Sequence, residues 1–181
     1  MKYTLSTFVP FQHNNLGYIQ TVINIARSQD NSNLQGALTS TLIYINAVDY
    51  ISFHLLDNLI EMDSLITNHH LNGVFYRNDK GPNSMPLHRI IEELEKYSFP
   101  LKEDFVENLK NFQKVRNPIT HNLLSLRQEQ INSGEADNFI LNIKTIAEQL
   151  LDQYDTIVRG VLDEWNIHLG KISATQSLNL P

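Results

Sequence analysis

The chain has 181 residues, a formal net charge of −6 and no cysteine. The lack of cysteine excludes disulfides, thiolate metal ligands and a cysteine nucleophile. The acidic balance excludes a protein whose whole surface binds nucleic acid, and no apolar run approaches the roughly 18 residues of a membrane-spanning helix. The first residues also lack the apolar run of a signal peptide. An apolar fraction of 41% suffices for a packed core, so we expect one folded domain. The lack of cysteine fits a reducing environment, so we expect a cytoplasmic protein.

Apolar residues recur at three- and four-residue spacing along most of the chain, which predicts helices and no strand. A first helix is expected over 15–28, and a polar turn separates it from a long second helix over 34–67. An irregular connection over 68–84 precedes a short helix over 86–97, which begins at a proline. The last helix is expected over 136–167.

The apolar stripe of each predicted helix marks the residues expected in the core. In the first two helices these are Leu16, Ile19, Ile23, Ala26, Leu38, Leu42, Ile45, Leu56, Leu59 and Met62. In the last helix they are Ile140, Ile143, Ala147, Leu150, Leu151, Tyr154, Ile157, Val158, Val161 and Trp165. We predict an all-α fold, a four-to-five-helix up-and-down bundle in a single domain over 1–170. A flexible polar tail is expected over 171–181.

A proline interrupts the segment 102–126, which otherwise has the pattern of one amphipathic helix. Pro118 would remove a helical hydrogen bond and clash with the preceding turn, at a cost of about 3 kcal/mol. It also disfavours a helical conformation for the residue before it. We therefore predict a break, in which one helix ends near Val115 or Arg116, Asn117 caps, and Pro118 lies in the first turn of the next helix.

Such a break would bring Arg116 and His121 together. In an unbroken helix two residues five apart diverge by about 140°. With a turn between them, the guanidinium can fold back beside the imidazole at the start of the new helix. The free N–H groups and partial positive charge of a helix N-terminus would complete a site suited to a phosphate. The alternative is that Asn117 and Pro118 only separate two helices, and that Arg116 and His121 are solvated.

The sequence Arg116-Asn117-x-x-x-His121 resembles the Arg-x(4–6)-His signature of HEPN domains, in the form with asparagine directly after arginine. The motif follows an amphipathic helix within an all-helical chain, which is also typical of that family. The motif and the residues around it that resemble the family span 105–126. The predicted helices are compatible with the HEPN fold over most of the chain. The resemblance therefore implies an HEPN-like bundle.

Many HEPN proteins are metal-independent endoribonucleases that act as homodimers with two motifs facing one another. The resemblance thus implies RNA as substrate, no cofactor, and a toxin or phage-defence effector with an antitoxin protein as a candidate partner. His121 would act on the ribose 2′-OH or the leaving 5′-oxygen, Arg116 would stabilise charge on the phosphoryl oxygens, and Asn117 would orient the pair. Some HEPN toxins carry a modified tyrosine two residues after the histidine; Leu123 stands there, so that control is not expected.

Two other interpretations remain open for the motif. Other HEPN domains have lost catalysis and serve in binding or assembly. The chain could also be an unrelated helical scaffold in which the motif occurs by chance.

The chemistry of RNA cleavage favours a dimer. Attack by the 2′-OH needs one group to accept a proton and another to donate one, and a single histidine cannot hold both protonation states at once. Two subunits supply two histidines with pKa values near neutrality, and two arginines. The motif also lies in the most basic stretch of the chain, where we expect three further residues to bind substrate: Lys110, Lys114 and Arg127.

Polar residues on the second predicted helix allow different interpretations. Asp49 falls on or beside the apolar stripe, where its carboxylate either reaches and orients Arg116 or is a solvated boundary residue. His54, Asp57 and Glu61 share a helical face and imitate metal-ligand spacing. A di-metal bundle would need Glu-x-x-His pairs, which do not occur, so we expect a solvated polar face and no metal site.

Overall fold

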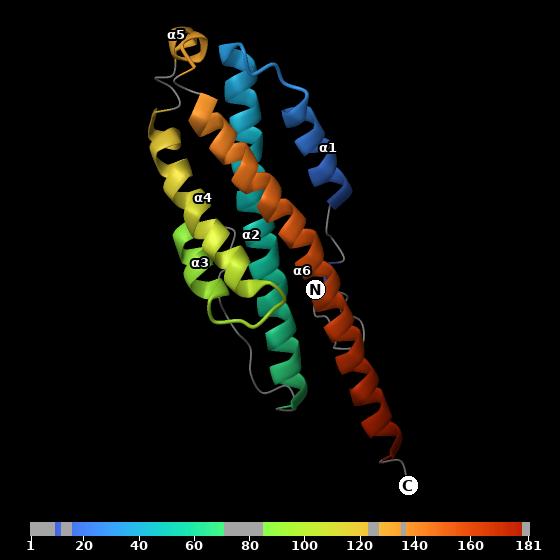
Figure 1. The fold of residues 1–181 in the computed structure, drawn as a ribbon. Helices are drawn as coiled ribbons and strands as arrows, with labels where there is room; N and C mark the ends of the chain where they lie inside the picture. Colours follow the sequence, from blue (N-terminus) through green and yellow to red (C-terminus); the bar gives the residue numbers. More distant parts are fainter. Residues whose placement is uncertain (1–9, 12–15, 71–84, 123–126, 135–136, 179–181) are drawn as a thin grey trace.

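The computed structural model describes residues 10–11, 16–70, 85–122, 127–134 and 137–178, which form helices and their connections (Figure 1). The helices are α1 (Leu16–Arg27), α2 (Leu34–His70), α3 (Leu87–Leu94), α4 (Lys102–Asn122), α5 (Gln128–Asn132) and α6 (Asp137–Leu178). No strand occurs within these ranges, so the prediction of an all-α fold is confirmed. None of these helices is both long and apolar enough to cross a membrane.

The long helices run alternately in opposite directions. In Figure 1 the chain rises along α1, descends along α2, rises along α4 and descends along α6. The α2 and α6 helices lie against each other, α4 packs on α6, and α1 packs on α2. The short α3 contacts both α2 and α4. The site described below lies among α2, α3 and α4.

The apolar stripes predicted for α2 and α6 form most of the core. Leu56, Ile143 and Leu150 have no exposed surface, and burial of such a side chain contributes about 1.5–3 kcal/mol. Tyr154 and Trp165 are buried, as the pattern predicted. The assignment of Leu42 to the core is wrong: its side chain is 44% exposed. It lies on the outer face of α2, one turn before an exposed asparagine whose side chain donates to the Leu42 carbonyl.

The predicted break at Pro118 is wrong, because α4 runs unbroken from Lys102 to Asn122 with the proline inside it. Phe105, Leu109 and Phe112 are fully buried along this helix. Their packing offsets the local cost of the proline, which is the loss of one backbone hydrogen bond and a clash with the preceding turn. Tertiary contacts therefore decide the conformation of this segment.

Some helix ends differ from the prediction. The last helix continues to Leu178 instead of ending near Ile167, so 171–178, expected in the tail, is helical. The second helix continues to His70. Most of the connection expected over 68–84 lies outside the described part of the chain.

A glycine on α6 positions the start of α4. A Cβ added to Gly160 would lie 2.6 Å from the Cγ atom of Pro100, in the turn that precedes α4. The next residue, Leu101, has a φ of 57°, which is uncommon for a residue with a branched side chain. The missing Cβ thus lets the turn before α4 pack directly against α6.

Candidate functional site

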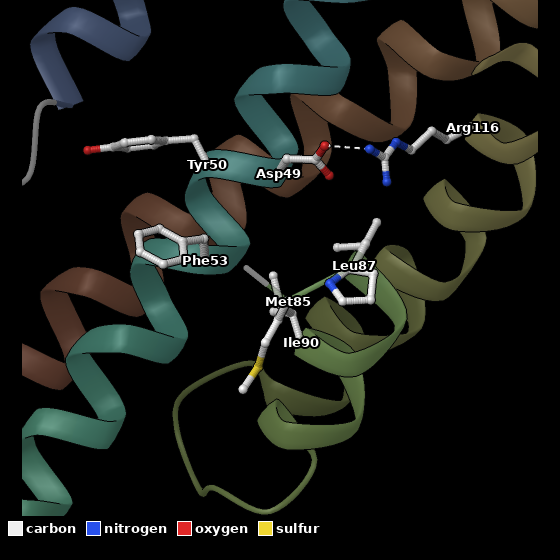
Figure 2. A pocket seen from close by; sticks show the side chains of 8 residues that line it. Asp49, Tyr50, Phe53, Met85, Leu87, Ile90 and Arg116 are labelled. Atoms are coloured by element: carbon white, nitrogen blue, oxygen red, sulfur yellow. Dashed lines mark hydrogen bonds and ion pairs between the residues drawn. The ribbon is translucent and has the colours of Figure 1, made fainter. Parts of the chain in front are cut away.

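Arg116 and Asp49 form an ion pair between α4 and α2. Arg116 follows Phe112 by one helical turn, so it extends the buried face of α4 toward α2. Its Nη2 donates to Asp49 Oδ2 at 2.6 Å (Figure 2). The side chains are 23% and 32% exposed, respectively. Of the two interpretations of Asp49 that the sequence allowed, the one in which it reaches Arg116 is therefore correct.

The Asp49 carboxylate has fewer hydrogen bonds than its burial requires. Burial raises its pKa above the ordinary value, and the attraction of Arg116 opposes this only in part. Its second oxygen, Oδ1, is buried, and within the described ranges no residue donates to it. A buried acceptor without a donor costs about 1–3 kcal/mol. Carboxylates with perturbed pKa values gather at functional sites, which makes this pair a candidate site.

A hollow of about 380 Å³ opens beside the ion pair (Figure 2). The ion pair forms a polar end, and the remaining walls are apolar or aromatic. These walls come from α2 and from the first turns of α3 with its approach: Tyr50, Phe53, Met85, Pro86, Leu87 and Ile90. Because the N-terminus of α3 borders the hollow, its first N–H groups add partial positive charge there.

The unbroken α4 separates the two ends of the motif. The Cα atoms of Arg116 and His121 lie about 140° apart around the axis of a regular helix, so the juxtaposition expected from a break at Pro118 does not arise. The side chain of His121 lies outside the described part of the chain. Asn117 is exposed beside Arg116.

The predicted substrate-binding residues do not gather around Arg116. Lys110 donates to Glu95, the residue that follows α3, at 2.5 Å on an exposed surface. Lys114 is exposed, and its position on α4 lies about 160° around the axis from that of Arg116. Arg127 is exposed at the start of α5, where its backbone N–H donates to the Gln130 side chain at 3.0 Å. Among the residues predicted for the site, Asp49 is one that the structure brings into contact with Arg116.

The buried environment of His54 differs from the solvated face that the sequence predicted. This residue was expected on a solvated face, but its Nδ1 lies 2.8 Å from the hydroxyl oxygen of Tyr154 in the core. Its ring also stacks on Tyr50, with centroids 5.5 Å apart. The neighbouring Leu55 and Leu56, both fully buried, were the available signal. Within the described ranges, no three acidic or histidine side chains are grouped so that they could hold a metal.

Comparison of the chain with protein-family models, with curated proteins and with solved structures gave no match. The fold and the site therefore define the class of protein: an all-helical chain with an arginine–aspartate pair at the edge of a hollow.

Proposed function

We propose that the protein is a metal-independent endoribonuclease of the HEPN type, with an HEPN-like bundle, that acts as a homodimer. The observation that carries this proposal is the setting of Arg116, the first residue of the Arg-Asn-x-x-x-His sequence, which Asp49 holds at the edge of a hollow. A guanidinium held in one orientation is a preorganised donor to phosphoryl oxygens, because it needs little rearrangement when charge develops on them.

The proposed reaction is attack of the ribose 2′-oxygen on the adjacent phosphorus. The O2′–P bond forms and the P–O5′ bond breaks, which leaves a 2′,3′-cyclic phosphate and a 5′-hydroxyl. One group accepts the proton of the 2′-OH and another gives a proton to the leaving oxygen. The His121 residues of two protomers would perform these two roles, while Arg116 stabilises the charge on phosphorus-bound oxygens and Asn117 orients the reacting groups.

The continuity of α4 supports a site shared between two chains. Arg116 and His121 of one chain start from different sides of the helix, about 140° apart. Two copies of the helix end packed together would present Arg116 of one copy and His121 of the other to the same phosphate. A dimer would also double the positive charge at the site, which an acidic chain needs in order to bind RNA.

Incubation of the purified full chain with mixed RNA and a chelator tests the proposal. We expect products with cyclic phosphate ends, and a loss of at least about 100-fold in Arg116→Ala and in His121→Ala. Arg159→Ala is the matched control, because Arg159 is an exposed arginine of α6 that pairs with an aspartate one turn away. Cleavage that survives either motif substitution, or that requires a divalent cation, contradicts the proposal.

The partial burial of the Arg116 side chain also favours a second candidate function. In this alternative the protein is an HEPN-type binding or assembly module without catalysis. Only 23% of the Arg116 side chain is exposed, so its pairing with Asp49 could serve mainly to join α4 to α2. A binding module would leave RNA intact in the same assay. Arg116→Ala would then lower stability without any change in RNA.

Growth experiments would test the biological role. We propose that the nuclease is a toxin or phage-defence effector restrained by an antitoxin protein. Expression of the parent chain should then arrest growth, and Arg116→Ala or His121→Ala should relieve the arrest. Arrest that both variants retain would contradict a role through RNA cleavage.

A further inference from the structure

The hollow beside Arg116 has one aromatic wall and one aliphatic wall. Figure 2 shows Phe53 on α2 across from Met85 and Ile90. Tyr50, on the same stretch of α2, is held by its stacking on His54, with an angle of 11° between the ring planes. In Figure 2 the Tyr50 ring points away from Met85 and Ile90, so Phe53 is the ring that faces the aliphatic wall.

The polar end of the hollow combines positive charge with a hydrogen-bond acceptor. Arg116 borders it, and Figure 2 shows Leu87, the first residue of α3, beside the ion pair. The partial positive charge of the α3 N-terminus therefore adds to that of the guanidinium. Asp49 contributes its carboxylate as the acceptor: its side chain is 32% exposed at the edge of the hollow, and its Oδ2 accepts from Arg116.

From this arrangement we infer that the hollow binds one nucleobase of the RNA substrate, with the adjoining phosphate on Arg116, an inference that rests on the proposed ribonuclease function. Bases stack on aromatic side chains, and carboxylates accept hydrogen bonds from their amino groups. An aliphatic ligand would leave the charged end unmatched, and a free phosphate would leave the aromatic wall unused. A volume of about 380 Å³ is near the lower end for small-molecule pockets, about 300–1,000 Å³, which suits one nucleotide rather than several.

Binding of the four ribonucleoside 3′-monophosphates to the full chain tests this inference without requiring cleavage. We expect Phe53→Leu, which keeps an apolar side chain but removes the stacking surface, to weaken binding about five- to tenfold. Met85→Trp should weaken binding as well, because the larger side chain fills the hollow. Tyr18→Leu is the matched control: Tyr18 is 69% exposed on α1 and is not part of this hollow, so its replacement should leave binding unchanged.

The outcomes separate failure of the pocket from failure of the nuclease. The pocket is overturned if the parent binds none of the nucleotides, or if Phe53→Leu and Met85→Trp bind them as the parent does while keeping its melting temperature. If the parent cleaves RNA through Arg116 and His121 but Phe53→Leu changes neither KM nor base preference at the cut site, only the pocket fails. If nucleotides bind through Phe53 and RNA stays intact, the nuclease proposal fails and nucleotide binding stands.

Discussion

Two partly buried carboxylates join helices of this bundle to arginines, and their surroundings differ. Glu148 of α6 accepts hydrogen bonds from Arg27 of α1 at 3.0 Å and from the Tyr44 hydroxyl of α2 at 2.7 Å. Asp49 of α2 accepts one from Arg116 of α4. The two carboxylate side chains are similarly exposed, 29% for Glu148 and 32% for Asp49. Exposure alone therefore does not distinguish them.

The pKa values of the two carboxyl groups shift in opposite directions. Burial acts to raise the pKa of Glu148, but the hydrogen bonds from Tyr44 and Arg27, together with the positive charges of Arg27 and Lys144, outweigh it, and the pKa is lowered. Burial raises the pKa of Asp49, and Arg116 alone does not reverse this. The balance between desolvation on one side and donors and nearby positive charge on the other thus decides whether the charged form is favoured. Glu148 has the surroundings of a structural contact, whereas Asp49 has those typical of a functional site.

The largest expected difference between the two pairs is in RNA cleavage. Arg116→Lys keeps the positive charge but loses the planar fork that orients on a phosphate and on Asp49. We expect cleavage to fall about 100-fold in this variant, comparable to the loss of one oriented donor. Arg27→Lys, the same change in the other pair, should leave the rate unchanged. Equal losses in both variants would mean that the two pairs share one role.

Stability should show the opposite ranking. Glu148→Ala leaves the Tyr44 hydroxyl without its acceptor in a residue that is only 2% exposed, at a cost of about 1–3 kcal/mol. Asp49→Ala should cost less, because it also removes a carboxylate whose charge is disfavoured by burial. Urea unfolding measures both free energies, and unchanged m-values would show that the unfolded state is comparable. A larger loss in Asp49→Ala would contradict the assignment of the two roles.

Acidification should affect the two carboxylates in opposite ways. The folded-state pKa of Glu148 is below its ordinary value of 4.5, so its contribution to stability is lost as pH falls from 4.5 through that lower value. The folded-state pKa of Asp49 is above its ordinary value of 3.8, so its protonation during acidification adds stability. In urea unfolding between pH 7 and about 3, Glu148→Gln should lose less stability than the parent, and Asp49→Asn should lose more. If both variants had the same pH dependence of stability as the parent, the inferred directions of the two pKa shifts would be wrong.

The comparison also shows what the sequence could predict. Periodicity predicted the helices and most of the α6 core, because the apolar stripe of a helix indicates which of its faces is buried. It also placed Asp49 where it could reach Arg116, although it could not decide whether the contact forms. The two residues are 67 positions apart, so the answer depends on how α2 packs near α4.

The remaining features depend on contacts that local patterns do not contain. The local cost of Pro118 predicted a break, but the energy that keeps α4 continuous comes from buried residues such as Phe112. Phe53 and Ile90 form opposite walls of one hollow only because α3 packs beside α2. His54 is buried because a neighbouring helix supplies the hydroxyl of Tyr154, which the sequence of α2 cannot reveal.

The smallest expected effect separates charge from hydrogen bonding at Glu148. The Arg27 side chain is 43% exposed, so Arg27→Ala should lower the free energy of unfolding by only about 0.2–1 kcal/mol. Salt at about 1 M screens charges over about 3 Å, so the difference should nearly vanish there. Tyr44→Phe removes a more buried hydrogen bond, and its cost of about 1 kcal/mol should persist in salt. If salt instead abolished the effect of Tyr44→Phe and spared that of Arg27→Ala, the Glu148 contact would depend on packing by the arginine stem rather than on the tyrosine hydroxyl.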